Sequence, residues 1–401
     1  MDDLSNLSFA STRRDLSQAR HTAPNVYADP EIYELEKERI FMRNWLFVAR
    51  EEEVENPGDY MALRIFDEPI LLARDKAGIL RAFANVCRHR GSRLVADEKG
   101  ACRNALVCPF HGWVYNLDGT LRGAARPKSF PPLDKDEFAL KPLECEVWQG
   151  FVFIRFAPGP QPSVAEVMKP FEAELSHYRS EEMVPAGDIW TQESPVNWKS
   201  VRDVDNEGYH VAMAHPALQD LYGSTYYDEP FVDGLCRSFA TYNPHAGRRW
   251  SVRNYVRISP ENARLPEHLR KAWIYFGLFP NCVIAVTPET VQFYQEFPVA
   301  VGKTLLRGGI YRYREEDRAH RLARYLAFRI DRDTQAEDVQ LTVWSNEAMT
   351  SNAFAGFYLS DLEYGVRTHH DHLRRVLPVM TLKDAPEEKE MAGVNAGLRQ
   401  G

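Results

Sequence analysis

The sequence lacks the features that would place it in a membrane or on nucleic acid. No apolar run approaches the ~20 residues that a membrane-spanning helix needs. Positive charge is not in excess, because 49 lysines and arginines face 57 acidic residues and the net charge is −8. Such a chain is a poor partner for nucleic acid or for an anionic membrane. These absences favour a soluble globular protein with other partners.

Secretion signals and nucleotide-binding motifs are also missing. The residues before Asn25 are polar and have no apolar core segment, so they do not resemble a signal peptide, and we expect a cytoplasmic protein. No Gly-x-Gly-x-x-Gly follows a predicted strand and no P-loop occurs, so no motif binds flavin or nicotinamide. Six cysteines in 401 residues predict thiols or metal ligands rather than a disulfide framework.

Hydrophobic periodicity divides the chain into an all-β part and a mixed part. Residues 29–50 have helical spacing, and Asp29-Pro30 is the predicted start of a helix. Between about 45 and 157, short apolar runs alternate with Gly, Asp and Pro, which predicts strands and turns. A Pro-rich linker follows at 157–167. Long strands at 271–314 and helices at 317–352 and 359–380 then predict an α+β fold.

The first motif that carries chemistry pairs one cysteine with one histidine on each of two loops. Cys87-x-His89 is followed after eighteen residues by Cys108-x-x-His111. A zinc finger instead usually has a cysteine pair followed by a histidine pair on a helix. The alternating order is typical of a Rieske [2Fe–2S] centre, where two thiolates hold one iron and two imidazoles hold the other. Cys102 lies outside both loops and is predicted to be structural.

The second motif is a pair of histidines, His210 and His215, for which a carboxylate is needed from elsewhere. On a regular helix the two would point about 140° apart, so they need a distorted turn or a helix end to reach one ion. Two histidines and a distant carboxylate form the facial triad of mononuclear non-haem Fe(II) sites. Glu337 and Asp338 are the downstream candidates. The pattern alone is weak, but the iron–sulfur motif before it supports this interpretation.

Together the two motifs resemble the large (α) subunits of Rieske non-haem iron oxygenases, the aromatic ring-hydroxylating family. The resemblance runs through nearly the whole chain, including "NVCRHRGSRL", "CPFHGWVYNLDGTLRG", "NWKSVRDVDNEGYH" and "EDVQL". It implies an all-β Rieske domain of residues 43–157, inserted in a helix-grip catalytic domain of residues 158–401. Residues 1–42 would form a helical segment that packs on the catalytic domain.

The resemblance also implies a role for each residue of the two motifs. The cluster ligands would be Cys87, His89, Cys108 and His111. The iron triad would be His210, His215 and Asp338, with Glu337 as the alternative carboxylate. In the family a carboxylate three residues before the first iron histidine bridges to a cluster histidine of the next subunit. That residue is Glu207, which would face His111 of the next chain, with Asp203 and Asp205 as rival bridges.

The implied protein is a terminal oxygenase with one [2Fe–2S] cluster and one mononuclear Fe(II) per chain. A separate reductase, with or without a ferredoxin, would deliver electrons from NAD(P)H. The head-to-tail electron path implies a homotrimer, and the resemblance leaves room for a small β subunit. Two alternatives from other classes are a non-catalytic Rieske electron carrier and a zinc-stabilised binding protein.

The substrate is the least defined part of this prediction. The family favours hydroxylation of a small aromatic compound. Glu207 resembles the subset that acts on quaternary amines such as carnitine, so oxidation of an N- or O-methyl group is the alternative. Pocket candidates, which are equally explained as core, are Tyr275, Phe276, Phe279, Phe293 and Tyr294. Arg307 and Arg312 would suit a carboxylate substrate, but are predicted to be solvated.

Overall fold

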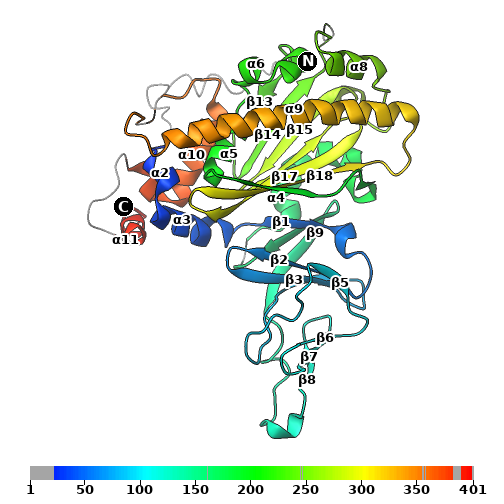
Figure 1. Ribbon diagram of the computed structural model, residues 1–401, viewed down its shortest axis with the longest axis vertical. Helices are drawn as coiled ribbons and strands as arrows, with labels where there is room; N and C mark the ends of the chain where they lie inside the picture. Colours follow the sequence, from blue (N-terminus) through cyan, green and yellow to red (C-terminus); the bar gives the residue numbers. More distant parts are fainter. Residues whose placement is uncertain are drawn as a thin grey trace. The chain divides into compact units, whose positions relative to one another are not determined.

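The computed structural model describes residues 22–399 apart from 160, 244, 246, 355, 357 and 383–389. Residues 1–21, half of the predicted N-terminal segment, therefore lie outside the described residues. Those described form two compact units, one of residues 42–172 and one of the residues before 42 and after 172 (Figure 1). None of the described helices is long and apolar enough to cross a membrane.

The unit of residues 42–172 is built of antiparallel strands. Within its described part, seven strands form a sheet in the order β1-β10-β9-β4-β3-β2-β5, and three short strands form the sheet β6-β7-β8. Every residue of β1, an edge strand, and of its neighbour β10 is buried. The strands are β1 (Leu46–Arg50), β2 (Asp59–Ile65), β3 (Glu68–Arg74), β4 (Leu80–Ala84), β5 (Lys99–Ala101), β6 (Leu106–Val107), β7 (Val114–Tyr115), β8 (Leu121–Gly123), β9 (Pro142–Trp148) and β10 (Phe151–Arg155).

The other unit is organised around an antiparallel sheet of eight described strands. Their order is β11-β18-β17-β16-β15-β14-β13, and β12 pairs with β18. The strands are β11 (Val184–Pro185), β12 (Trp190–Ser194), β13 (Tyr227–Asp228), β14 (Leu235–Thr241), β15 (Ala272–Leu278), β16 (Cys282–Val286), β17 (Thr290–Ala300) and β18 (Lys303–Arg312). This sheet, together with the helices of the unit, confirms the predicted α+β class.

A long helix, α9 (Arg318–Ala348), lies across this sheet in the view of Figure 1. The side chain of Asp317 caps its first turn by accepting the backbone N–H of His320 at 2.8 Å. Ala323, Leu326 and Ile330 recur at helical spacing and are buried, so one stripe of α9 anchors it in the core. A second face of α9 lines a cavity.

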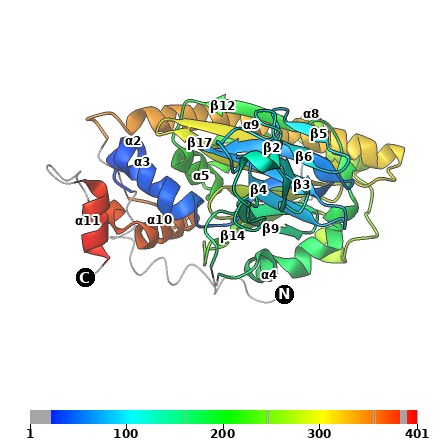
Figure 2. The same cartoon turned by 90° about the horizontal axis from the view of Figure 1, so that it is seen from below.

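The remaining helices are shorter. They are α2 (Asn25–Ala28), α3 (Pro30–Glu36), α4 (Val164–Leu175), α5 (Trp198–Asp205), α6 (Val211–Ala214), α7 (Pro216–Tyr222), α8 (Trp250–Ile258), α10 (Tyr364–Val376) and α11 (Met391–Leu398). Figures 1 and 2 both place α2, α3, α10 and α11 at one end of the unit. The backbone N–H of Met391 bonds Glu31 there at 2.7 Å, which ties the two ends of the described chain together.

Two helix predictions differ from the structure. Asp29 does cap a helix, since its carboxylate accepts the N–H groups of Glu31 and Ile32. The helix does not run to residue 50, however: it ends in a π-turn at Lys37–Phe41, and 46–50 form β1. This run is apolar on both faces and pairs with β10, which outweighs its helical spacing. The sequence also predicted no helix beyond residue 380, but α11 follows α10.

Candidate metal centres

The two loops with Cys and His are built alike. The N–H of Gly91 donates to the Cys87 carbonyl and the N–H of Gly112 to the Cys108 carbonyl, both at 3.0 Å. Both glycines have positive φ, +73° and +66°, a conformation that other residues rarely adopt. Each cysteine N–H also donates, at 2.8 Å, to the carbonyl five residues on. Backbone hydrogen bonds therefore fix the turn in both loops.

Among the four predicted cluster ligands, the two thiols lie together and the two imidazoles lie together. The thiols of Cys87 and Cys108 are buried beside each other, and the imidazole centroids of His89 and His111 are 4.7 Å apart. The Nδ1 atoms of both histidines are buried and have no hydrogen-bond partner among the described residues. Two paired thiols and two paired imidazoles with unsatisfied nitrogens fit a centre in which each pair holds one iron. His89 is further held by stacking on Trp113 at 5.0 Å.

The surroundings of the Cys108 thiol favour the thiolate form that iron requires, whereas burial raises the pKa of the Cys87 thiol. Burial raises the pKa of Cys108, but the backbone N–H groups of Phe110 and His111 outweigh burial and lower it. The Tyr115 hydroxyl accepts the Arg88 N–H at 2.9 Å and lies 3.3 Å from Cys87 Sγ, so its own proton points to the sulfur. Cys102 packs against the same core outside the four, which agrees with its predicted structural role.

The second centre lies where α6 and α7 meet the long helix. His210 precedes α6 and His215 separates α6 from α7, so both sit at helix ends, as the spacing predicted. Their Nε2 atoms are 3.0 Å apart. Asp338, on α9, places Oδ1 2.8 Å from His215 Nε2 and 3.5 Å from His210 Nε2. These three side chains can hold one cation.

Two further carboxylates hold the outer nitrogens of the histidines. Glu207 Oε1 is 2.6 Å from His210 Nδ1, and Glu337 Oε2 is 2.9 Å from His215 Nδ1. A carboxylate accepts, so each Nδ1 carries a proton, and each Nε2 faces Asp338, where a bound metal would take the place of a second proton. Burial lowers the pKa of His210, but hydrogen bonds to Asp338 and Glu207 raise it to about 10. The carboxylates around these rings therefore favour a positive charge at the triad.

The turn between Glu207 and His210 is held by hydrogen bonds to the side chain of Asp228. The N–H of Gly208 donates to Asp228 Oδ2 at 2.7 Å, and the Tyr226 hydroxyl donates to Asp228 Oδ1 at 2.5 Å. A Cβ on Gly208 would lie 1.9 Å from the Tyr226 ring, so the close approach requires glycine. The sequence did not predict these contacts of Asp228, because no pattern in it links residue 228 to the turn at residue 208.

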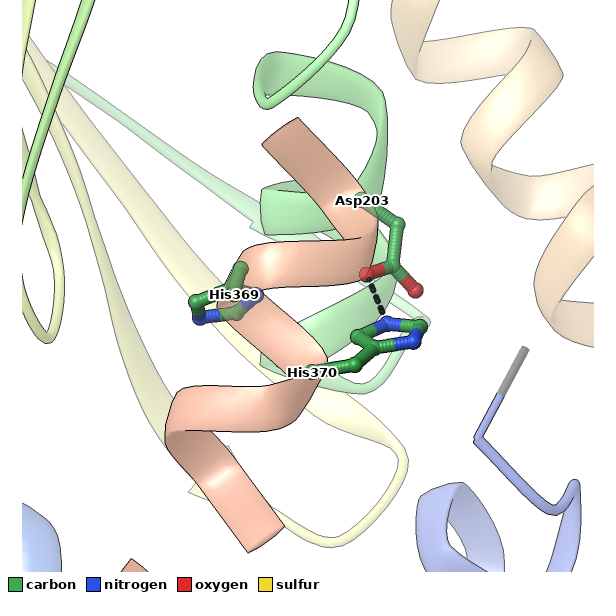
Figure 3. Close-up of side chains that lie close together, drawn as sticks. All are labelled: Asp203, His369 and His370. Carbon is green, nitrogen blue, oxygen red and sulfur yellow. Dashed lines mark hydrogen bonds and ion pairs between the residues drawn. The ribbon is translucent and has the colours of Figure 1, made fainter. Parts of the chain in front are cut away.

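The rival bridge Asp203 belongs to a separate buried network. Tyr27 donates to Asp203 Oδ2 at 2.6 Å, and His370 Nε2 lies 2.7 Å from Oδ1. Figure 3 shows His370 turned toward Asp203, whereas His369 leaves the other side of α10. The Thr22 N–H donates to His370 Nδ1 at 3.3 Å, so Nε2 carries the proton and has no lone pair for a metal. The three residues lie close enough to hold an ion, but this protonation favours a structural network.

The three candidate bridges thus have different surroundings. Asp203 is occupied by Tyr27 and His370, and Asp205 lies 3.4 Å from Arg202 inside the unit. Of the three, Glu207 is the one whose carboxylate bonds a histidine of the triad in the described structure. The exposed side chains of Tyr209 and Met213 flank it, so the turn lies at the surface of its unit.

A cavity of about 150 Å³ opens beside the triad. It is lined by aromatic rings, by carboxylates and by neutral polar groups: Tyr222, Tyr226, Tyr275, Phe293, Tyr294, Asp205, Glu207, Asp331, Asp338, Gln292 and Gln335 are among them. A cavity of roughly this volume holds a molecule of about the size of benzene. A small substrate is therefore favoured over a polycyclic one.

The pocket candidates from the sequence were partly right. Tyr275, Phe293 and Tyr294 line the cavity, whereas Phe276 and Phe279 are buried but do not line it. Neither Arg307 nor Arg312 lines it. Both are half-buried rather than solvated: the guanidinium of Arg307 lies 5.3 Å from the centre of the Phe293 ring, and that of Arg312 bonds backbone carbonyls.

Comparison with known proteins finds the same two domains. Residues 44–135 match the family described as Rieske [2Fe-2S] domain, and residues 178–378 match the family described as ring hydroxylating alpha subunit (catalytic domain). The carnitine monooxygenase oxygenase subunit of Escherichia coli (strain K12) is 31% identical over 294 residues, 72% of this chain and 74% of that protein.

Two further relatives differ in the chemistry that their names describe. The 2-aminobenzenesulfonate 2,3-dioxygenase subunit alpha of Alcaligenes sp. is 28% identical over 325 residues, 78% of this chain and 80% of that protein. A solved quaternary ammonium Rieske monooxygenase is 25% identical with a TM-score of 0.76, over 90% of this chain and 97% of that one. A carrier or a zinc-binding protein would leave the match to a catalytic domain unexplained.

Proposed function

This chain belongs to the Rieske non-haem iron oxygenases as the α subunit, the terminal oxygenase component, and we propose that it oxidises a small organic cation at a carbon bonded to nitrogen. Its cofactors are one Rieske [2Fe–2S] cluster and one mononuclear iron. A reductase or ferredoxin of the same system supplies its electrons. We retain residues 43–157 as the Rieske domain and 158–401 as the catalytic domain.

The residues proposed to hold the two groups are those already described. Cys87, His89, Cys108 and His111 would bind the cluster, and His210, His215 and Asp338 the iron. When bound, the cluster stores one electron and the iron activates O₂ beside the substrate. Glu337 orients His215 and leaves Asp338 as the carboxylate ligand, which is our choice between the two.

The cavity carries the proposal that the substrate is a cation. Asp205, Glu207, Asp331 and Asp338 line it, whereas the guanidinium of the lining residue Arg332 pairs with Asp333 at 2.8 Å. Asp205 lies 3.4 Å from Arg202 and Glu207 bonds His210, so Asp331, which accepts a hydrogen bond from the neutral Gln292, is the carboxylate of these four that leaves its charge open to a substrate. Aromatic faces next to carboxylates attract ammonium groups, and the names of two relatives describe oxidation of carnitine or a quaternary ammonium compound.

The proposed reaction balances with O₂ and two electrons from the reductase. One oxygen atom enters a C–H bond next to nitrogen, and the other leaves as water with two protons. The hydroxylated carbon then breaks from nitrogen, which releases an aldehyde and a smaller amine. The aromatic and neutral polar walls exclude bulk water and hold the substrate, and Glu207 accepts the Nδ1 proton of His210 throughout.

For the electron path, we propose that Glu207 joins His210 to His111 of a neighbouring copy in a homotrimer. Glu207 already binds His210, and its outer edge lies among exposed apolar groups, including Met213, which is 88% exposed. His111 is likewise preceded by the exposed Phe110. Exposed apolar side chains beside both ends of the path suit burial against each other in a head-to-tail ring.

A second candidate function is oxidation of an aromatic ring. It is favoured by one relative, whose name describes a dioxygenase of an aminobenzenesulfonate, and by the rings of Tyr222, Tyr275 and Phe293 in the cavity. Such a reaction would add both oxygen atoms to the ring and release no aldehyde.

A substrate screen with a surrogate reductase separates the two. We expect small N-methylated and quaternary amines to stimulate O₂ uptake, with one aldehyde and one amine released per O₂. A matched set of benzoates and aminobenzenes serves as the comparison. Coupled O₂ uptake with an aromatic compound, without aldehyde and without any response to amines, would contradict the proposal.

A further inference from the structure

Asp331 is a carboxylate in the cavity that the iron site does not use. It lies on α9 seven residues before Asp338, so the two share one face of the helix, about 10 Å apart along its axis. Its Oδ2 accepts a hydrogen bond from Gln292 Nε2 at 3.0 Å. No cationic side chain of the described residues pairs with it, and neighbouring Arg332 pairs with Asp333 instead.

A carboxylate in this position is costly unless something balances it. Gln292 on β17 bonds Asp331, the charge of Asp331 acts on Tyr275 of β15, and Asp331 lines the cavity. A buried carboxylate without a cation is destabilised by several kcal/mol unless it is protonated or paired. Burial accordingly raises its pKa to about 7. The missing partner can approach from the cavity, which is where a substrate enters.

The groups around Asp331 suit one kind of partner. The hydroxyls of Tyr222 and Tyr275 are 2.9 Å apart and bond each other, and both rings line the cavity together with Phe293. Burial and the Asp331 charge raise the pKa of Tyr275, so its hydroxyl stays neutral. Aromatic faces and one carboxylate form a favourable site for an ammonium group, whose charge is spread over its substituents.

We propose that Asp331, positioned by Gln292, binds the ammonium group of the substrate and so determines which carbon faces the iron triad. This inference rests on the proposed function and names the residue that recognises the charge. Because Asp331 and Asp338 are two helical turns apart, an ammonium group held at Asp331 directs its other substituents along α9 toward the triad.

A pair of isosteric probes tests this without turnover. Choline and 3,3-dimethylbutan-1-ol have the same shape, but the second carries carbon in place of the charged nitrogen. Calorimetric titration of the iron-loaded oxygenase at pH 8, without O₂, should give at least about tenfold tighter binding of choline. Asp331→Asn should remove that preference, because it weakens the binding of choline and leaves the affinity for the alcohol unchanged. Asp331→Glu should restore part of the preference for choline.

The control is Glu347→Gln, which removes the same charge from an exposed position on α9. It should leave the preference intact, and the visible spectrum of the cluster and the melting temperature check that each variant is folded. The proposal is overturned if the unsubstituted protein binds the two probes equally or does not bind choline, or if Asp331→Asn keeps the preference. Failure of amines to support aldehyde release, with the binding preference intact, would overturn the proposed function alone.

Discussion

The two proposed metal-binding regions are constructed in opposite ways. In the Rieske loops the backbone does the positioning, through paired N–H to carbonyl bonds around Cys87 and Cys108 and two glycines of positive φ. In the catalytic unit side chains do it: Glu207 and Glu337 orient the two histidines, and Asp338 comes from a separate long helix.

This difference has a physical consequence for the two cofactors. A site held by backbone bonds changes little when neighbouring side chains change, so the cluster should tolerate substitutions that leave its four ligands intact. A site held by carboxylates depends on each of them, because removing one frees a ring to rotate or to change tautomer. Substitutions in the second region should therefore alter iron binding and electron transfer while the cluster stays intact.

The largest effect is expected from Glu207→Gln. The amide can still accept the Nδ1 proton of His210, but it loses the charge and one acceptor oxygen that the neighbouring His111 would need. We expect product formation in a single turnover of the pre-reduced protein to fall to background, with the reduced cluster unchanged by electron paramagnetic resonance.

The matched variant is Asp203→Asn, which removes the rival carboxylate. It should lower the melting temperature, because the amide leaves one acceptor oxygen where Tyr27 and His370 each use one, but it should keep single-turnover product formation. The opposite pattern, with transfer lost in Asp203→Asn and kept in Glu207→Gln, would assign the bridge to Asp203.

The same contrast explains what the sequence could and could not predict. The cluster motif is local, so the order of Cys87, His89, Cys108 and His111 was enough to predict it. The two iron histidines could be predicted only with a break in the helix, and their carboxylate stayed open between two adjacent residues on α9. The structure separates these, because residues one apart on a helix point about 100° apart and reach opposite nitrogens of His215.

Residues that act through tertiary contacts were beyond the sequence. Asp228, on β13, accepts a hydrogen bond from the Gly208 N–H in the turn before His210, and no sequence periodicity connects the two residues. Asp331 is an intermediate case: its spacing of seven from Asp338 places it on the same helical face, but only the sheet beneath shows that this face lines a cavity. The helical spacing that continues to residue 50 was misleading over its last residues, which pair with β10, as the strand pattern from about residue 45 predicted.

A smaller effect is expected from Glu337→Gln. The amide cannot hold the Nδ1 proton of His215 as strongly as a carboxylate, so that imidazole becomes a poorer ligand. Loss of such a partner typically weakens metal binding by about 10- to 100-fold. Iron titration followed by competition with a chelator measures this, and Asp338→Asn, which should abolish binding, provides the upper limit. Equal loss in both variants would mean that Glu337 is itself a ligand.

In the Rieske loops, Tyr115→Phe should change the reduction potential of the [2Fe–2S] cluster, and the protein should still bind the cluster. It removes the hydroxyl that lies 3.3 Å from Cys87 Sγ, and a reduced cluster carries more negative charge for that donor to stabilise. One hydrogen bond is worth about 1 kcal/mol, which corresponds to a potential lowered by roughly 40 mV for one electron. Redox titration of the visible spectrum measures it, and an unchanged potential would contradict the assigned bond.

The smallest effect is a pH dependence of stability that comes from Asp331. Burial raises its pKa from 3.8 to about 7, against the hydrogen bond from Gln292. The folded protein therefore keeps a proton that the unfolded chain loses, so this group makes the free energy of unfolding fall as pH rises from about 4 to 7. Tyr222, Tyr275 and Gln292, which face it from α7, β15 and β17, stay neutral in this range, and the guanidinium of Arg332 on α9 pairs with Asp333.

Asp331→Asn should remove this dependence. Melting temperatures of the variant and the unsubstituted protein should agree near pH 4. Near pH 8 the variant should melt a few degrees higher, at roughly 2–4 °C for each kcal/mol of difference in the free energy of unfolding. The exposed substitution Glu347→Gln should show no such separation. Parallel curves for Asp331→Asn would mean that the carboxylate is already balanced at neutral pH, and the cavity would then offer a substrate cation no unpaired charge.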